Sequence, residues 1–159
     1  VYANLKTATH PRLFVHCTLN RRNWRDIEAI ALLVRDLPAV RGMTVQFFYP
    51  YRQGEEGLAL AKAWGFTYKA MFVWDKVKHN FGHYNSVRHE LLLICTKGSF
   101  TPEVMTLHDS VQTIERTDEH SEKPEEFRRI IESLYPSASK IELFARTEVD
   151  GWTMWGDES

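Results

Sequence analysis

Lys123 stands directly before a segment predicted to begin a helix, with Pro124 at its first position and Glu125 and Glu126 in its first turn. The first backbone N–H groups of a helix have no partner within the helix, so a lysine beside them can help to hold a ligand carboxylate. The alternative is an exposed lysine that pairs with Glu126. Lys123 is therefore the first candidate binding residue.

A second set of candidates lies at the ends of the last two predicted strands, over 140–146 and 152–156. It consists of Glu142, Arg146, Asp157 and Glu158. The carboxyl ends of strands in an open α/β sheet line the ligand crevice. Carboxylates at that edge can accept hydrogen bonds from ribose hydroxyls or from an adenine amino group. The alternative is that these residues are solvated strand ends.

Four aromatic side chains offer flat surfaces on which a flipped-out base could stack. They are Trp74, Tyr84, Trp152 and Trp155. Aromatic residues in strands more often belong to an ordinary hydrophobic core, so both interpretations stay open.

The histidines of the middle segment do not predict a metal site. His79, His83 and His89 lie near Asp75 and Glu90, but the histidine spacing matches no zinc pattern. The sequence also has no GxGxxG, GxxxxGK[ST] or HExxH motif. We therefore expect ordinary loop histidines and no metal.

The elements that must position these residues alternate between strands and helices. Apolar runs predict strands over 12–19, 43–49, 67–75, 89–96, 111–115, 140–146 and 152–156. Helical spacing predicts helices over 24–37, 55–64 and 124–134, with Gly65 as a left-handed stop. The polar segment 76–88 is predicted to be a loop, and the last two strands to form an antiparallel hairpin. This order favours an α/β fold with a mixed, mostly parallel sheet and helices on both faces.

The composition is that of one globular domain over residues 1–159. With 43% hydrophobic and 26% charged residues, the chain is not of the disordered, collagenous or disulfide-scaffold class. Cys17 and Cys95 are isolated and expected to be reduced, with Cys95 a buried apolar residue. No apolar run approaches the roughly 20 residues that span a bilayer, and no signal peptide is visible. We therefore expect a cytoplasmic protein without membrane contact.

The charge is unevenly distributed along the chain. Residues 1–100 carry a balance of +7 and residues 101–159 a balance of −8. A basic first part could face a nucleic acid. The alternative is that the two parts neutralise each other within one fold.

Several motifs in the second part of the chain follow the order of a known family. They are AWGFTYKAMFVWDK (63–76), NFGHYNSVRHELLLICTKG (80–98), EHSEKPEEFRRIIESLYP (119–136) and KIELFAR…GWTMWGDE (140–158). Over residues 63–158 the chain thus resembles the MT-A70 family of nucleic-acid adenine N6 methyltransferases. The resemblance implies a Rossmann-like three-layer sandwich that binds S-adenosylmethionine.

The resemblance also implies roles for individual residues. Lys123 would match the lysine that holds the cofactor carboxylate, and Arg146 the arginine near the ribose. Asp157 and Glu158 fall where the family usually has Asn and Gln or Glu against ribose and adenine. The residues that would lie by the loops shaping the target-base and cofactor pockets are Trp74, Tyr84, Arg88 and Glu90.

The family's catalytic signature, Asp/Asn-Pro-Pro-Trp/Tyr, is missing. The nearest string, Tyr49-Pro50-Tyr51, lacks the acceptor side chain and one proline. Residues 12–60 look more like a β-α-β piece of a radical-SAM barrel, and the cysteines cannot supply that family's Cys-x3-Cys-x2-Cys cluster motif. Residues 1–62 are therefore predicted to be an atypical front half.

Two functions follow. The first is an MT-A70-like domain that binds S-adenosylmethionine and acts on adenine in DNA or RNA. The second is a non-catalytic binding protein, either a pseudoenzyme subunit or a recombined or designed chain. It would act through surface contacts with a nucleic acid or a protein partner. Fold alone does not decide between them.

Overall fold

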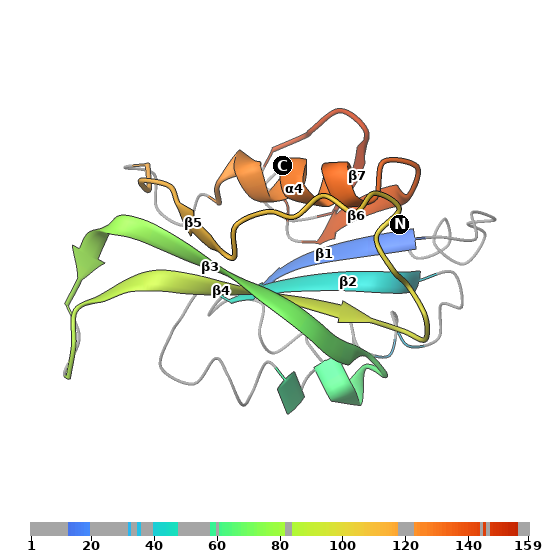
Figure 1. Cartoon of the computed structure of the whole chain (residues 1–159), viewed down its shortest axis with the longest axis horizontal. Helices are drawn as coiled ribbons and strands as arrows, with labels where there is room; N and C mark the ends of the chain where they lie inside the picture. The colour runs from blue at the N-terminus through green and yellow to red at the C-terminus, as the bar shows by residue number, and fades with distance from the viewer. Residues whose placement is uncertain are drawn as a thin grey trace.

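One seven-stranded sheet organises the chain (Figure 1). The computed structural model describes residues 13–19, 32, 35, 40–47, 58–59, 61–81, 84–117, 123–143, 145 and 147–155. The strands are β1 (Leu13–Leu19), β2 (Val40–Phe47), β3 (Thr67–Asn80), β4 (Val87–Thr96), β5 (Val111–Thr113), β6 (Ser139–Leu143) and β7 (Trp152–Trp155). Their order across the sheet is β5-β3-β4-β2-β1-β6-β7.

The sheet is mixed and mostly parallel, which confirms the predicted fold class. β1 runs parallel to β2 and β6, β6 to β7, and β3 to β5. β4 is antiparallel to both of its neighbours, β2 and β3. The carboxyl ends of the parallel strands therefore meet at one edge, which is where α/β sheets bind ligands.

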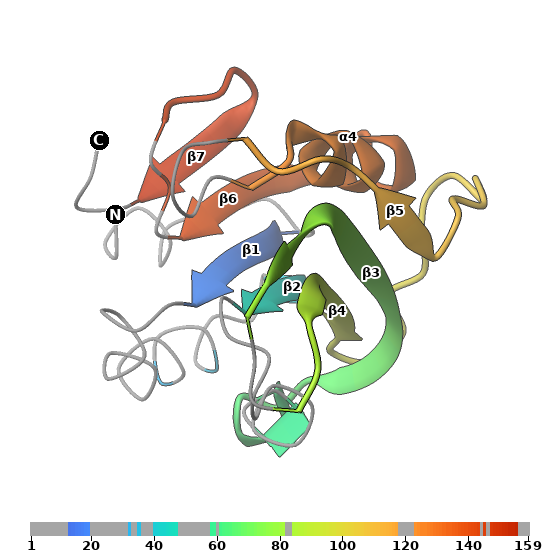
Figure 2. The same cartoon turned by 90° about the vertical axis from the view of Figure 1, so that its left-hand side faces the viewer.

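The helix α4 (Glu125–Leu134) packs against the concave face of the sheet, which curves around it (Figure 2). Its buried face consists of Phe127, Ile130, Ile131 and Leu134, which recur at the three- and four-residue spacing of an amphipathic helix. They pack in one cluster with Phe14, Phe72, Trp74, Leu92, Phe100 and Tyr135. Each such side chain contributes roughly 1.5–3 kcal/mol when fully buried, so this contact fixes the helix on the sheet.

Helical residues also lie on the opposite side of the sheet from α4 (Figure 2). Residues 58–59 and 61–63 are helical, and Ala61 and Trp64 are buried. Gly65 follows with φ of +79°, the left-handed stop that the sequence predicted. Of the predicted helix over 24–37, only Leu32 and Arg35 belong to the described residues, and both are helical.

The predicted loop over 76–88 is wrong at both ends. β3 continues to Asn80 and β4 begins at Val87, so the two strands form a long hairpin that projects beyond the rest of the sheet (Figure 1). Main-chain pairing of Asn80 with Val87 needs no apolar side chain. Strands that leave the core therefore lose the alternation by which a sequence reveals them.

The predicted antiparallel hairpin of the last two strands is also wrong, because β7 is parallel to β6. These strands have only five and four residues. Residues 144–151 connect them, and eight residues can span roughly 27 Å. That is longer than the roughly 17 Å of a five-residue strand, so the chain can return to the starting edge.

Candidate functional site

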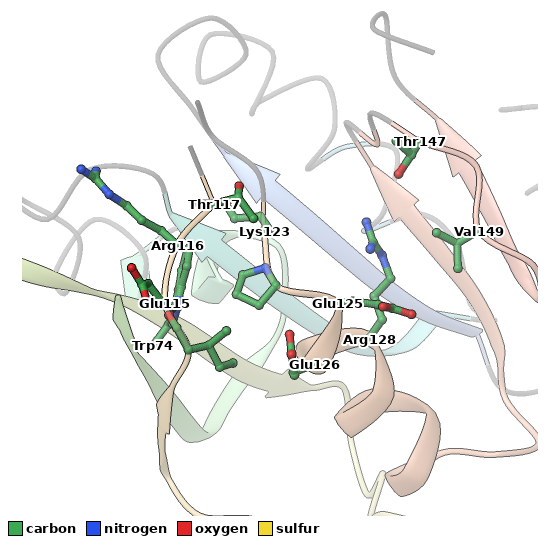
Figure 3. A pocket seen from close by; sticks show the side chains of 12 residues that line it. Trp74, Glu115, Arg116, Thr117, Lys123, Glu125, Glu126, Arg128, Thr147 and Val149 are labelled. Atoms are coloured by element: carbon green, nitrogen blue, oxygen red, sulfur yellow. Dashed lines mark hydrogen bonds between the residues drawn. The ribbon is translucent and has the colours of Figure 1, made fainter. Parts of the chain in front are cut away.

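A cavity of about 440 Å³ lies at the carboxyl edge of the parallel strands (Figure 3). Its walls come from β3, the segment after β5, the start of α4 and the β6–β7 connection. The lining residues are Trp74, Ile114, Glu115, Arg116, Thr117, Lys123, Pro124, Glu125, Glu126, Arg128, Thr147 and Val149. The volume falls within the range of roughly 300–1,000 Å³ that is usual for small-molecule sites.

Behind one wall of this cavity, Glu90 lies between two lysines. Lys76 Nζ donates to Glu90 Oε1 at 3.1 Å, and Lys123 Nζ donates to Oε2. The side chains of this Lys76–Glu90–Lys123 triad are at most 8% exposed. The carboxylate of Glu90 thus holds the Lys123 ammonium group in place at this end of the cavity. Lys123 also lines the cavity, and an ammonium group has three N–H donors that suit an anionic acceptor.

Trp74 is fixed against the triad. Its indole Nε1 donates to the carbonyl oxygen of Ile114 at 2.7 Å, and its ring meets Phe127 edge-on at 6.5 Å between centroids. The ammonium groups of Lys76 and Lys123 each lie 5.8 Å from the centre of a Trp74 ring. Cations at this distance are attracted to the face of an indole. The tryptophan thus gives the cavity a flat wall that its neighbours hold rigid.

The start of α4 forms the next part of the wall. Pro124 precedes the helix with φ of −59°, a value that proline imposes and that suits the entry to a helix. Within the described residues, no side-chain hydrogen bond caps this terminus. Its first backbone N–H groups and the positive end of the helix dipole therefore adjoin the cavity, beside the carboxylates of Glu125 and Glu126.

A bulge in β3 follows Lys76 directly. The pairing of β3 with β4 shifts between Asp75 and Asn80, and Val77 has φ of 64°, which is uncommon for a β-branched residue. The Asp75 carboxylate accepts from the Val77 N–H at 3.0 Å and from Arg88 Nη2 at 2.9 Å. Arg88 therefore stabilises the bulge through Asp75.

Arg128 is a second cation of the cavity wall. Its Nε donates to Glu142 Oε2 at 2.7 Å and its Nη2 to Oε1 at 3.3 Å. The side chains of Arg128 and Glu142 are only 15% and 5% exposed. A two-point contact between guanidinium and carboxylate fixes the plane of the arginine as well as its position.

Two buried titratable residues of the sheet lie outside the cavity lining. His16 on β1 is opposite Glu142 on β6, and its Nδ1 lies 2.6 Å from Thr44 Oγ1. Burial lowers the pKa of His16 to about 4, against the opposing effect of Glu142, so this imidazole is neutral at pH 7. Burial raises the pKa of Cys95 to about 11. This thiol is fully buried, as predicted, and stays protonated at neutral pH.

The structure places the residues proposed from the sequence in several different surroundings. Lys123 and Trp74 line the cavity, and Glu90 and Glu142 lie behind the cations that do. Arg88 and Tyr84 are not among the lining residues, and the Tyr84 side chain is fully exposed on the β3–β4 hairpin. Arg146, Asp157 and Glu158 lie outside the described residues. Trp152 belongs to the core cluster, and its Nε1 donates to Glu132 Oε1 at 2.6 Å.

Lys76 and Arg128 are site residues that the sequence did not single out. Lys76 lies two residues after Trp74, and side chains at this separation in a strand share a face. That signal was lost because the segment was predicted to be a loop. Arg128 lies five residues after Lys123, and only the register of β6 beneath α4 brings it to Glu142.

Two further properties concern the described residues only, namely metal ligation and membrane insertion. They include no group of three or more His, Cys, Asp or Glu residues arranged to hold a metal ion. His79 Nδ1 instead lies 2.9 Å from Ser86 Oγ, and Glu90 is held by the two lysines. None of the helices in this part of the chain has the length and apolar character of a membrane span.

Comparison with known proteins gives a consistent result. The family model described as MT-A70 matches residues 6–158, and so includes the segment 12–60 that suggested a second, weaker resemblance. Type II methyltransferase M.MunI from Mycoplasma sp is 40% identical over 108 residues, which are 67% of this chain and 46% of that protein. An N(6)-adenosine-methyltransferase MT-A70-like protein from Arabidopsis thaliana is 29% identical over 117 residues, 67% of this chain and 17% of that protein. The chain thus spans less than half the length of each relative.

Proposed function

The chain belongs to the MT-A70 family, related to adenine N6 methyltransferases, and on this premise we propose that it binds S-adenosylmethionine in the cavity beside α4. We further propose that it serves methylation of adenine in a nucleic acid without transferring the methyl group by itself. The observation that carries the first part is the triad, in which Glu90, itself paired with Lys76, holds Lys123 in the cavity wall at the start of α4.

The chemistry of the cavity fits the cofactor at its amino-acid end. That end of S-adenosylmethionine carries a carboxylate and an ammonium group side by side. Lys123 and the first backbone N–H groups of α4 suit the carboxylate, and the carboxylates of Glu125 and Glu126 suit the ammonium group. Trp74 closes the wall beside Lys123 and keeps water from the ion pairs behind it. When bound, the cofactor supplies a methyl group on a positively charged sulfur.

The chain's own part in the reaction is then to bind and orient. An adenine amino group is a weak nucleophile, and in this family the Asp/Asn-Pro-Pro-Trp/Tyr signature accepts its hydrogens. No such tetrapeptide occurs among the 159 residues. We therefore propose that the acceptor for the adenine amino group is not provided by this sequence.

Cofactor binding is tested by titration calorimetry with S-adenosylhomocysteine, the demethylated product. We expect a Kd in the micromolar range, about −8 kcal/mol, and a rise of at least tenfold in Lys123→Met. Loss of this lysine removes the cation that faces the carboxylate but leaves Glu90 paired with Lys76, so the variant should fold. Lys69→Met, at an exposed position of β3, is the matched control and should keep the wild-type Kd. Equal affinity of the Lys123 variant and the wild type would show that the site has been wrongly assigned.

Catalysis is tested separately, with DNA and RNA oligonucleotides and labelled S-adenosylmethionine. We expect no N6-methyladenine from this chain alone, because the acceptor for the amino hydrogens is missing. Mass spectrometry of the digested oligonucleotides gives the answer. Methyl transfer that depends on the chain and is abolished by Lys123→Met would refute the second part of the proposal while supporting the first.

A further inference from the structure

The cavity wall carries two cations, and a buried carboxylate stands behind each. Glu90 stands behind Lys123, and Glu142 stands behind Arg128. The two carboxylates differ in how many cations they bind. Glu90 accepts from two lysines, whereas Glu142 accepts from Arg128 alone among the residues that the structure describes. Within the described residues, the charge of Arg128 is therefore matched by that of Glu142.

The pairing with Glu142 sets the chemistry of the wall around Arg128. An anion gains little from an arginine whose charge a buried carboxylate already balances. Such an arginine still has hydrogen-bond donors to offer. Guanidinium has five N–H donors, and the contacts with Glu142 use only Nε and Nη2. The remaining donors suit uncharged acceptors such as hydroxyl and ring oxygens.

The surroundings of Arg128 agree with an uncharged ligand group. Thr147 and Val149 line the same part of the cavity, and Arg128 points toward them in the close view (Figure 3). A hydroxyl and an aliphatic side chain beside a neutral ion pair suit the sugar of a ligand better than they suit its carboxylate. We infer that Arg128 contacts the ribose of the nucleoside and that Glu142 is a positioning residue that acts through Arg128. This inference rests on the proposed cofactor.

The experiment separates the two parts of the ligand. S-adenosylhomocysteine has both the nucleoside and the amino-acid end, whereas 5′-methylthioadenosine has the nucleoside only. Calorimetric Kd values for both ligands are measured for the wild type, Arg128→Met and Lys123→Met. We expect Arg128→Met to weaken both ligands about tenfold, since it removes contacts to the shared part. Lys123→Met should weaken S-adenosylhomocysteine and leave 5′-methylthioadenosine within twofold.

Two further variants guard against a misfolded protein and an indirect effect. Lys69→Met, at an exposed position of β3 away from the cavity lining, should change neither Kd. The double variant R128M/E142Q removes both members of the buried pair, so it leaves no uncompensated charge if Arg128→Met alone is unstable. If Glu142 acts only through Arg128, the double variant binds both ligands as weakly as Arg128→Met and no more weakly.

Each outcome of these titrations supports or overturns the role of Arg128. If Arg128→Met weakens S-adenosylhomocysteine but not 5′-methylthioadenosine, the arginine serves the amino-acid end and the inference is overturned. Unchanged Kd values for both ligands overturn it as well. If the wild-type protein binds neither ligand, the proposed cofactor itself is refuted, and the inference falls with it. These results are distinguishable because the wild-type Kd is measured first.

Discussion

Replacing Glu90 by glutamine should lower the free energy of unfolding by about 3–5 kcal/mol, the usual cost of removing one partner from a buried ion pair. Glu90 is 3% exposed and accepts from Lys76 and Lys123. In the Glu90→Gln variant these two ammonium groups face each other without the carboxylate, under a tryptophan that excludes water. Urea unfolding followed by tryptophan fluorescence measures the change.

The control for this prediction is Glu115→Gln. Glu115 also pairs with a lysine of β3, Lys78 at 3.2 Å, but both side chains are well exposed. Exposed pairs contribute about 0–1 kcal/mol, so this variant should stay close to the wild type. A loss below about 1 kcal/mol for Glu90→Gln would mean that the lysines are neutral or solvated in the native protein. Glu90 would then not be the buried carboxylate that binds two charged lysines.

Acidification should destabilise the protein through His16, by roughly 2–3 kcal/mol between pH 7.5 and 4.5. Burial lowers the pKa of this histidine to about 4 in the folded chain, whereas an unfolded histidine titrates near 6.5. Between these values the unfolded chain binds a proton that the native chain does not. The contribution is fully present above pH 6.5 and is lost as the pH falls toward 4.

The measurement compares how the free energy of unfolding depends on pH in the wild type and in the His16→Gln variant. His16→Gln keeps a group that can hydrogen-bond to Thr44 but cannot titrate. Between pH 7.5 and 4.5, the free energy of unfolding of this variant should therefore fall by roughly 2–3 kcal/mol less than that of the wild type. His89→Gln, at an exposed position of β4, should follow the wild type. Glu142, Arg128 and Lys123 also act on His16, and they remain in both variants. Parallel pH profiles for the wild type and His16→Gln would contradict the buried, neutral state of this histidine.

Local patterns determined most of the secondary structure. The apolar runs predicted β1, β4 and β6, and the three- and four-residue spacing after Pro124 predicted α4 with its buried face. Gly65 and Pro124 marked the helix boundaries because their backbone preferences act within a few residues. Lys123 could be predicted as a candidate binding residue for the same reason, because the prediction needed only its place before a helix, and the structure places it in the cavity lining.

The family, too, could be identified from the sequence. The motifs over residues 63–158 suggested it, and the MT-A70 model matches residues 6–158. What the motifs did not determine is which side chain contacts a ligand. The resemblance pointed to Glu90 and the predicted strand ends to Glu142, yet both carboxylates lie behind the cations that line the cavity.

Only the tertiary structure decided the pairings on which the site depends. Lys76 meets Glu90 because the β3–β4 register and its bulge bring residues 14 apart into contact. Arg128 meets Glu142 because β6 lies beneath α4, and β6 pairs parallel with β7 although the two strands are close in sequence. The periodicity of a sequence specifies which face of an element is buried. Which elements become neighbours, and in what register, depends on the packing of the whole sheet around α4, and local periodicity carries no signal for it.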